Sequence, residues 1–174
     1  EIEVAARITL AAQLAPIPNA PQKVINRLAT DDAIEVAWPV LAHSERVEDN
    51  ALIECAMMRS QQHLLAISRR RAVSERITDV LIARGDRPVL AGLAGNPGAQ
   101  ISELGYSTLV QRSADDDELT ERLGLRDDIP RRLFLKLLAN ASELVRVKLN
   151  AAHPQAPAAV ETAISKASER IQDL

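Results

Sequence analysis

The chain has 174 residues and a formal net charge of −3, with 47% apolar but only 2% aromatic residues. This composition supports a core of aliphatic side chains and excludes a disordered chain, while the charge provides no overall basic field to attract nucleic acid. No apolar run is long enough to span a bilayer, and Cys55 is the single cysteine, so we expect a cytoplasmic protein without an intrachain disulfide.

The first elements in chain order are a helix and a linker. Residues 2–14 carry aliphatic residues at helical spacing and predict a leading helix. Three prolines at positions 16–21 predict a linker that cannot be helical throughout. From residue 22 onward the helical pattern is interrupted by short polar turns, which lie at 30–32, 59–61, 84–86 and 113–117. Each repeating unit is therefore predicted to be a longer helix, a tight turn, a shorter helix and a loop.

Two apolar positions, a leucine and a later aliphatic residue, recur in each unit and set its register. A leucine followed by Ala or Gly recurs at Leu41, Leu65, Leu93 and Leu123. A polar stretch and then an aliphatic residue follow each of them, namely Val47, Val73, Ile101 and Ile129. The leucine spacings are irregular, yet they fall within the range of helical repeats.

The C-terminal part departs from this register. Residues 130–152 predict one long helix, and residues 158–172 predict a final helix. The predicted organisation is one helical-repeat domain over 1–174, with a leading helix and linker (1–21), repeats (22–150) and a C-terminal capping helix (151–174). Because the chain starts without Met and ends inside a helical pattern, we expect it to be a fragment of a longer protein.

Several stretches together resemble an uncharacterised bacterial family of HEAT-like α-helical repeat proteins, a domain of unknown function. They are LAPIPNAPQKVINRLA, VAWPVLAHS, HLLAISRRRAVSERITDVLIARGD, GNPGAQISELG and ERLGLRDDIPRRL, and they cover most of residues 10–150. The resemblance implies an all-α fold, an α-α superhelix of the HEAT/armadillo-like solenoid type with about four to five helical hairpins. It supplies no catalytic residues.

Three glycines, Gly92, Gly95 and Gly98, are spaced as in a nucleotide-binding loop. A phosphate-binding loop needs a strand before it and a helix after it, whereas here a helix comes first. We interpret Gly95 as a helix C-cap followed by an Asn-Pro-Gly turn, with Ser102 capping the next helix.

Metal and catalytic sites are not predicted. The histidines, His43, His63 and His153, lack partners at metal-binding spacing, and the acidic run 115–118 lacks the glycine and alternating ligands of a calcium loop. Cys55 lies on an apolar helix face and predicts a buried thiol. The sequence thus predicts no cofactor and no enzyme. A hydrolase using His43 or His63 stays a minor hypothesis that requires a nucleophile within hydrogen-bond reach.

Arginine-rich stretches are the candidate partner-binding sites. Residues 59–87 hold seven arginines against three acidic residues. The five candidates are Arg69, Arg70, Arg71, Arg131 and Arg132. We favour a non-enzymatic protein–protein interaction scaffold, as in a bacterial signalling or regulatory adaptor, with an unknown protein or peptide as partner. The alternative is a nucleic-acid-binding module, or a DNA-repair-like enzyme, using these loops; it is weakened because single-strand binding usually needs aromatic stacking platforms.

Overall fold

The computed structural model describes residues 3–152, which form eleven α-helices and no β-strand. Contacts group the chain into two compact units, Glu1–Leu109 and Val110–Leu174. The first unit contains α1 (Val4–Leu14), α2 (Gln22–Ala29), α3 (Ile34–His43), α4 (Asp49–Met58), α5 (Gln61–Ser68), α6 (Glu75–Arg84) and α7 (Arg87–Ala94). The second contains α9 (Asp117–Gly124), α10 (Arg131–Asn140) and α11 (Glu143–Ala152), and α8 (Glu103–Arg112) crosses the boundary. The predicted all-α class is confirmed, and a single domain over 1–174 stays a prediction.

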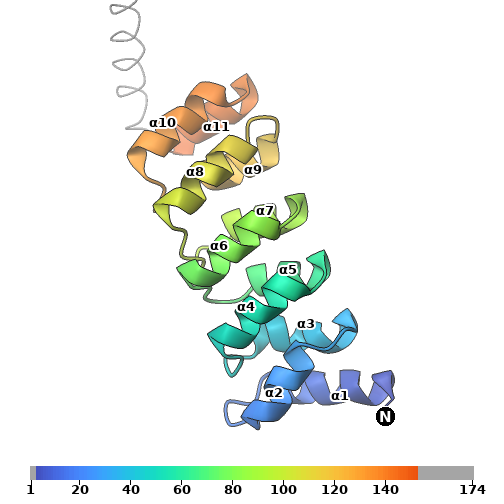
Figure 1. Ribbon diagram of the computed structural model, residues 1–174. Coiled ribbons are helices and arrows are strands. Elements are labelled where there is room, and N and C mark those ends of the chain that lie inside the picture. Colours follow the sequence, from blue (N-terminus) through green and yellow to red (C-terminus); the bar gives the residue numbers. More distant parts are fainter. Residues whose placement is uncertain (1–2, 153–174) are drawn as a thin grey trace, which may run out of the picture. The chain divides into compact units, whose positions relative to one another are not determined.

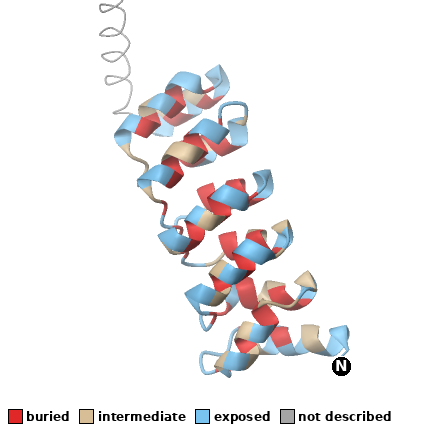
Figure 2. Cartoon of the chain, viewed as in Figure 1, coloured by how far each residue is buried: buried red, intermediate tan, exposed pale blue. Residues whose placement is uncertain are grey.

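Two layers of helices make up the first unit (Figure 1). In layer A, α1 packs on α3, α3 on α5, and α5 on α7; in layer B, α2 packs on α4 and α4 on α6. The aliphatic residues at helical spacing fill the space between the layers, including fully buried Ile25, Leu41, Ile67 and Leu81. Figure 2 shows these buried stretches on the inner faces of the helices. Each helical hairpin therefore buries its apolar face against its neighbours.

The tight turn at Arg84-Gly85-Asp86 is held by a local helix cap and by a contact with the neighbouring hairpin. Asp86 is the N-cap of α7 and accepts a hydrogen bond from the Val89 amide at 3.1 Å. The Gln61 side chain donates to the Arg84 carbonyl at 2.9 Å and accepts from the Asp86 amide at 2.9 Å. The cap follows from the residue type of Asp86, and the contact with Gln61 fastens the turn to the neighbouring hairpin.

The loop between α7 and α8 packs against the loop between α5 and α6. The Val73 amide donates to the Gly98 carbonyl at 3.0 Å, and the Gln100 amide donates to the Val73 carbonyl at 2.9 Å. A Cβ atom on Gly98 would lie 1.8 Å from the Arg71 carbonyl oxygen, so this close approach requires glycine. Gly95 is the C-cap of α7 as predicted, with φ −82°, a conformation open to any residue. The three glycines therefore belong to a seam between hairpins.

In the second unit, the prediction of one helix over 130–152 is wrong. The backbone turns at Ala141, where ψ is 146°, and separates α10 from α11. Ser142 accepts a hydrogen bond from the Val145 amide at 3.4 Å and donates to Asp117 at 2.9 Å. This cap and its partner on α9 favour a hairpin over a continuous helix. The predicted helix over 158–172 lies outside the described residues.

The leucine register is also corrected at one position. The sequence pattern pairs Leu65 with Leu93. In the structure, however, Leu65 is only half-buried, whereas Ile67 is fully buried. Counted from the last residue of each helix, Ile67 in α5 corresponds to Leu93 in α7 and Leu123 in α9. Both Leu65 and Ile67 fit a helical pattern locally, and packing against neighbouring helices selects Ile67.

Candidate partner-binding site

The central residue of the arginine cluster stabilises the fold. Arg70 is half-buried, and its guanidinium donates hydrogen bonds to the carbonyls of Leu41 at 2.5 Å and Ser44 at 2.9 Å. Burial lowers the pKa of Arg70, and the charges of Asp49 and Glu45 oppose that shift. Arg70 is thus used to join its loop to the end of α3, and this removes it from the predicted docking surface.

The two neighbouring arginines remain exposed. The Arg69 guanidinium lies over the Trp38 ring, 5.8 Å from its centroid, which is a cation–π distance. Arg71 lies 3.6 Å from the Glu45 carboxylate, with both side chains more than three-quarters exposed. The cluster therefore exposes two cationic side chains, Arg69 and Arg71, and Arg71 lies beside an acidic residue.

Arg131 and Arg132 are the first two residues of α10 and are exposed. They belong to the second unit, whereas the loop of Arg69 and Arg71 belongs to the first. A helix N-terminus disfavours positive side chains because of the helix dipole, so the helix itself does not favour arginine at these two positions. Both stay candidates for partner contact.

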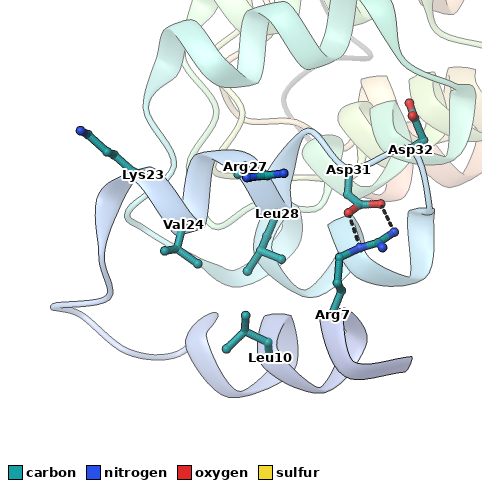
Figure 3. A pocket seen from close by; sticks show the side chains of 8 residues that line it. All are labelled: Arg7, Leu10, Lys23, Val24, Arg27, Leu28, Asp31 and Asp32. Carbon is teal, nitrogen blue, oxygen red and sulfur yellow. Dashed lines mark hydrogen bonds and ion pairs between the residues drawn. The ribbon is translucent and has the colours of Figure 1, made fainter. Parts of the chain in front are cut away.

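A groove between α1 and α2, which the sequence did not predict, is lined by apolar and charged side chains. Its volume is about 760 Å³. Leu10 of α1 faces Val24 and Leu28 of α2 across it (Figure 3). Leu10 is 36% exposed and Val24 is half-buried, so aliphatic surface remains open to solvent here.

The charged side chains around this groove differ in whether they form ion pairs with other described residues. Arg7 forms a two-pronged ion pair with Asp31, at 2.9 and 3.2 Å (Figure 3), and Asp32 pairs with Arg59. The remaining lining residues are Lys23 and Arg27, both exposed, and neither forms an ion pair with any residue of the described part. The groove therefore combines an apolar floor with two uncompensated positive charges.

One sequence signal could have located this groove. Lys23 and Arg27 are four residues apart and share a helix face with Val24, beside the predicted leading helix. Two cations beside an aliphatic residue on one helix face are a more informative pattern than the high density of arginines at residues 69–71.

His43 and His63 occupy different environments, and His153 lies outside the described residues. His43 is exposed, whereas His63 is 2% exposed. His63 Nε2 lies 2.9 Å from the Asp31 carbonyl, which can only accept, so Nε2 carries the ring proton and Nδ1 accepts from the Ser60 hydroxyl at 2.8 Å. Ser60 thus lies within reach of a histidine, as the hydrolase hypothesis requires. Both ring nitrogens, however, are engaged in joining the turn before α5 to the turn before α3.

The other reactive side chains show no assembled site. Burial raises the pKa of the Cys55 thiol to about 12, with a further contribution from Glu54. In the acidic run, Asp116 caps α9 by accepting from the Leu119 amide at 3.1 Å, and Glu118 pairs with Arg122 at 3.0 Å. Among residues 3–152, no group of three or more His, Cys, Asp or Glu side chains could hold a metal ion.

The fold and the groove define an all-α protein of packed helical hairpins with a partly apolar, positively charged groove in its first unit. The chain belongs to the DUF2336 family, described as an uncharacterised protein conserved in bacteria, whose model matches residues 36–173. No curated protein and no solved structure matches the chain. No helix of the described part has the length and hydropathy needed to cross a membrane.

Proposed function

We propose that this protein is a non-enzymatic scaffold that binds another protein through the α1–α2 groove. The observation that carries this proposal is the groove itself, where the open aliphatic side chains of Leu10 and Val24 lie beside Lys23 and Arg27, which pair with no acidic residue within 3–152. Apolar surface with a charged margin is the composition that protein interfaces favour. A HEAT-like array, acting as a signalling or regulatory adaptor in the bacterial cytoplasm, is the specific form we propose.

Affinity capture from cells tests this proposal when groove and loop variants are compared. Three versions of the chain are needed: wild type, the groove variant Leu10→Asp, and the loop variant Arg69→Ala with Arg71→Ala. We expect a specific partner to be retained by the wild type and the loop variant and lost by the groove variant. A partner lost only with the loop variant would move the site to the arginine loop and refute the groove as the interface.

Nucleic-acid binding by the arginine-rich loops is the weaker alternative. Arg70 donates to backbone carbonyls, and Arg71 lies beside Glu45, so this loop offers little uncompensated charge to a phosphate backbone. Fluorescence anisotropy with duplex DNA at low salt tests it. Salt-dependent binding that disappears with Arg69→Ala and Arg71→Ala would support nucleic acid over the scaffold.

A further inference from the structure

Among the described residues of the first unit, α2 is the first helix of layer B. In layer B, α4 packs against α2 on one side and α6 on the other, whereas α2 has only α4 as a layer neighbour. The side of α2 that meets α4 and the loop before it is marked by Gln22, which donates to the Arg46 carbonyl, and by Asn26, which donates to Glu48 at 3.3 Å. One side of α2 is therefore occupied by its layer B neighbour within residues 3–152.

The groove lies on the opposite side of α2. Val24 and Arg27 point away from the side of Gln22 and Asn26, since at about 100° per residue they lie roughly 180° and 120° from the middle of that side, and Lys23 lies between the two sides. These three side chains line the groove together with Leu10 of α1. The groove thus occupies the place where a layer B helix of a preceding hairpin would pack.

We infer that this groove binds an amphipathic α-helix of a partner protein, with aliphatic residues on one face and carboxylates beside them. The inference rests on the proposed function and names the chemistry of its partner. A helix fits because the floor is built by two helices that elsewhere pack against helices, and a helix in an apolar groove is a common recognition mode. Its aliphatic side chains would cover Leu10, Val24 and Leu28.

Charge complementarity selects an acidic helix. Arg7 and Asp32 are already paired within the chain, with Asp31 and Arg59, so the uncompensated charges in the groove are the two cations Lys23 and Arg27. These cations are four residues apart on one helix, and a facing helix can place two carboxylates at the same spacing. A basic helix would meet repulsion from both cations.

Selection from a displayed library of helix-forming peptides tests the inference, with the full chain as the target. We expect the selected peptides to carry aliphatic residues three and four positions apart, flanked by Asp or Glu. Their affinity should fall about tenfold or more on Lys23→Glu with Arg27→Glu, because two attractive pairs become repulsive. The affinity should stay unchanged in the matched control, Arg69→Glu with Arg71→Glu, which reverses two exposed charges after α5, away from the groove.

A second pair of variants separates binding from folding. Val24→Asp places a carboxylate in the groove and should abolish binding, and Leu10→Lys should do the same from the α1 side without adding negative charge. Both side chains are partly exposed, so circular dichroism should show an unchanged helical content. If Val24→Asp unfolds the chain, Leu10→Lys alone carries the test.

Three results would overturn the inference. Selected peptides that bind equally well to Val24→Asp, or that are basic, would place the interface elsewhere and leave the proposed scaffold function standing. Concentration-dependent dimerisation that Val24→Asp abolishes would make the occupant a second copy of this chain. Failure to select any peptide, together with no partner in the affinity capture, would refute both the inference and the proposed function.

Discussion

Replacing Gly98 with alanine should destabilise the protein far more than the same change at Gly95, three residues earlier. The added Cβ at Gly98 would lie 1.8 Å from the Arg71 carbonyl oxygen, so the two loops must separate. Their separation breaks two backbone hydrogen bonds, Val73 to Gly98 and Gln100 to Val73, at 3.0 and 2.9 Å. At about 1 kcal/mol each, with buried groups left unsatisfied, we expect a loss of about 2–3 kcal/mol.

Gly95 provides the matched control because it is exposed and has φ −82°. Alanine is compatible with this conformation and restricts the unfolded chain, so we expect a stability equal to wild type or up to about 1 kcal/mol higher. Urea unfolding followed by circular dichroism measures both variants, and hydrogen exchange of the Val73 and Gln100 amides reports the loop contact directly. A Gly98→Ala variant within about 0.5 kcal/mol of wild type would refute the reasoning.

Three further predictions concern side chains whose roles the structure assigns. Arg70→Ala should lower the free energy of unfolding by about 2–4 kcal/mol, because two charge-assisted hydrogen bonds are lost, while exposed Arg71→Ala should change it by less than about 0.5 kcal/mol in the same urea titration. The buried Cys55 thiol should resist iodoacetamide at pH 8 until the chain unfolds. Because folding raises the pKa of this thiol from 9.0 to about 12, its contribution to the free energy of unfolding is complete below pH 9 and should be lost as the pH rises toward 12. Asp86→Ala removes the N-cap of α7 and should cost about 1 kcal/mol, whereas Asp86→Asn should restore most of it.

The features that the sequence predicted correctly depend on neighbouring residues. The turn at Arg84–Asp86 needs only a cap and a glycine, and its role follows from the residue types at three consecutive positions. The leading helix follows equally from aliphatic spacing, and the structure places it at Val4–Leu14. Local chemistry therefore sufficed for most of the helices.

The features that were missed depend on residues far apart in the chain. The break between α10 and α11 is stabilised by the hydrogen bond from Ser142 to Asp117, 25 residues earlier. Whether Leu65 or Ile67 is the fully buried residue depends on which helices pack around α5. The groove is defined by α1 and α2 together, which are separated by a proline-containing linker. Helical periodicity within one segment carries no information about such partners.

Arginine density does not mark a binding site here, because the same loop position has the same structural role with an arginine or with a neutral residue. Two residues after the end of α5 stands Arg70, and two residues after the end of α7 stands Asn96. Arg70 donates to the carbonyls of Leu41 and Ser44, whereas Asn96 donates to those of Ser68 and Arg70, at 2.8 and 2.7 Å. In both cases a long or branched donor satisfies carbonyls at the end of the preceding layer A helix.

The position thus requires donor capacity, and it accepts either a charged or a neutral side chain. An arginine here contributes to the seam between hairpins, and its charge gives no information about a ligand. The charges that do bear on binding are those without an ion pair beside open apolar surface, as Lys23 and Arg27 are among the described residues at the α1–α2 groove. Exchanging Arg70 for a neutral donor such as glutamine should therefore leave partner binding intact, whereas neutralising Lys23 and Arg27 should weaken it.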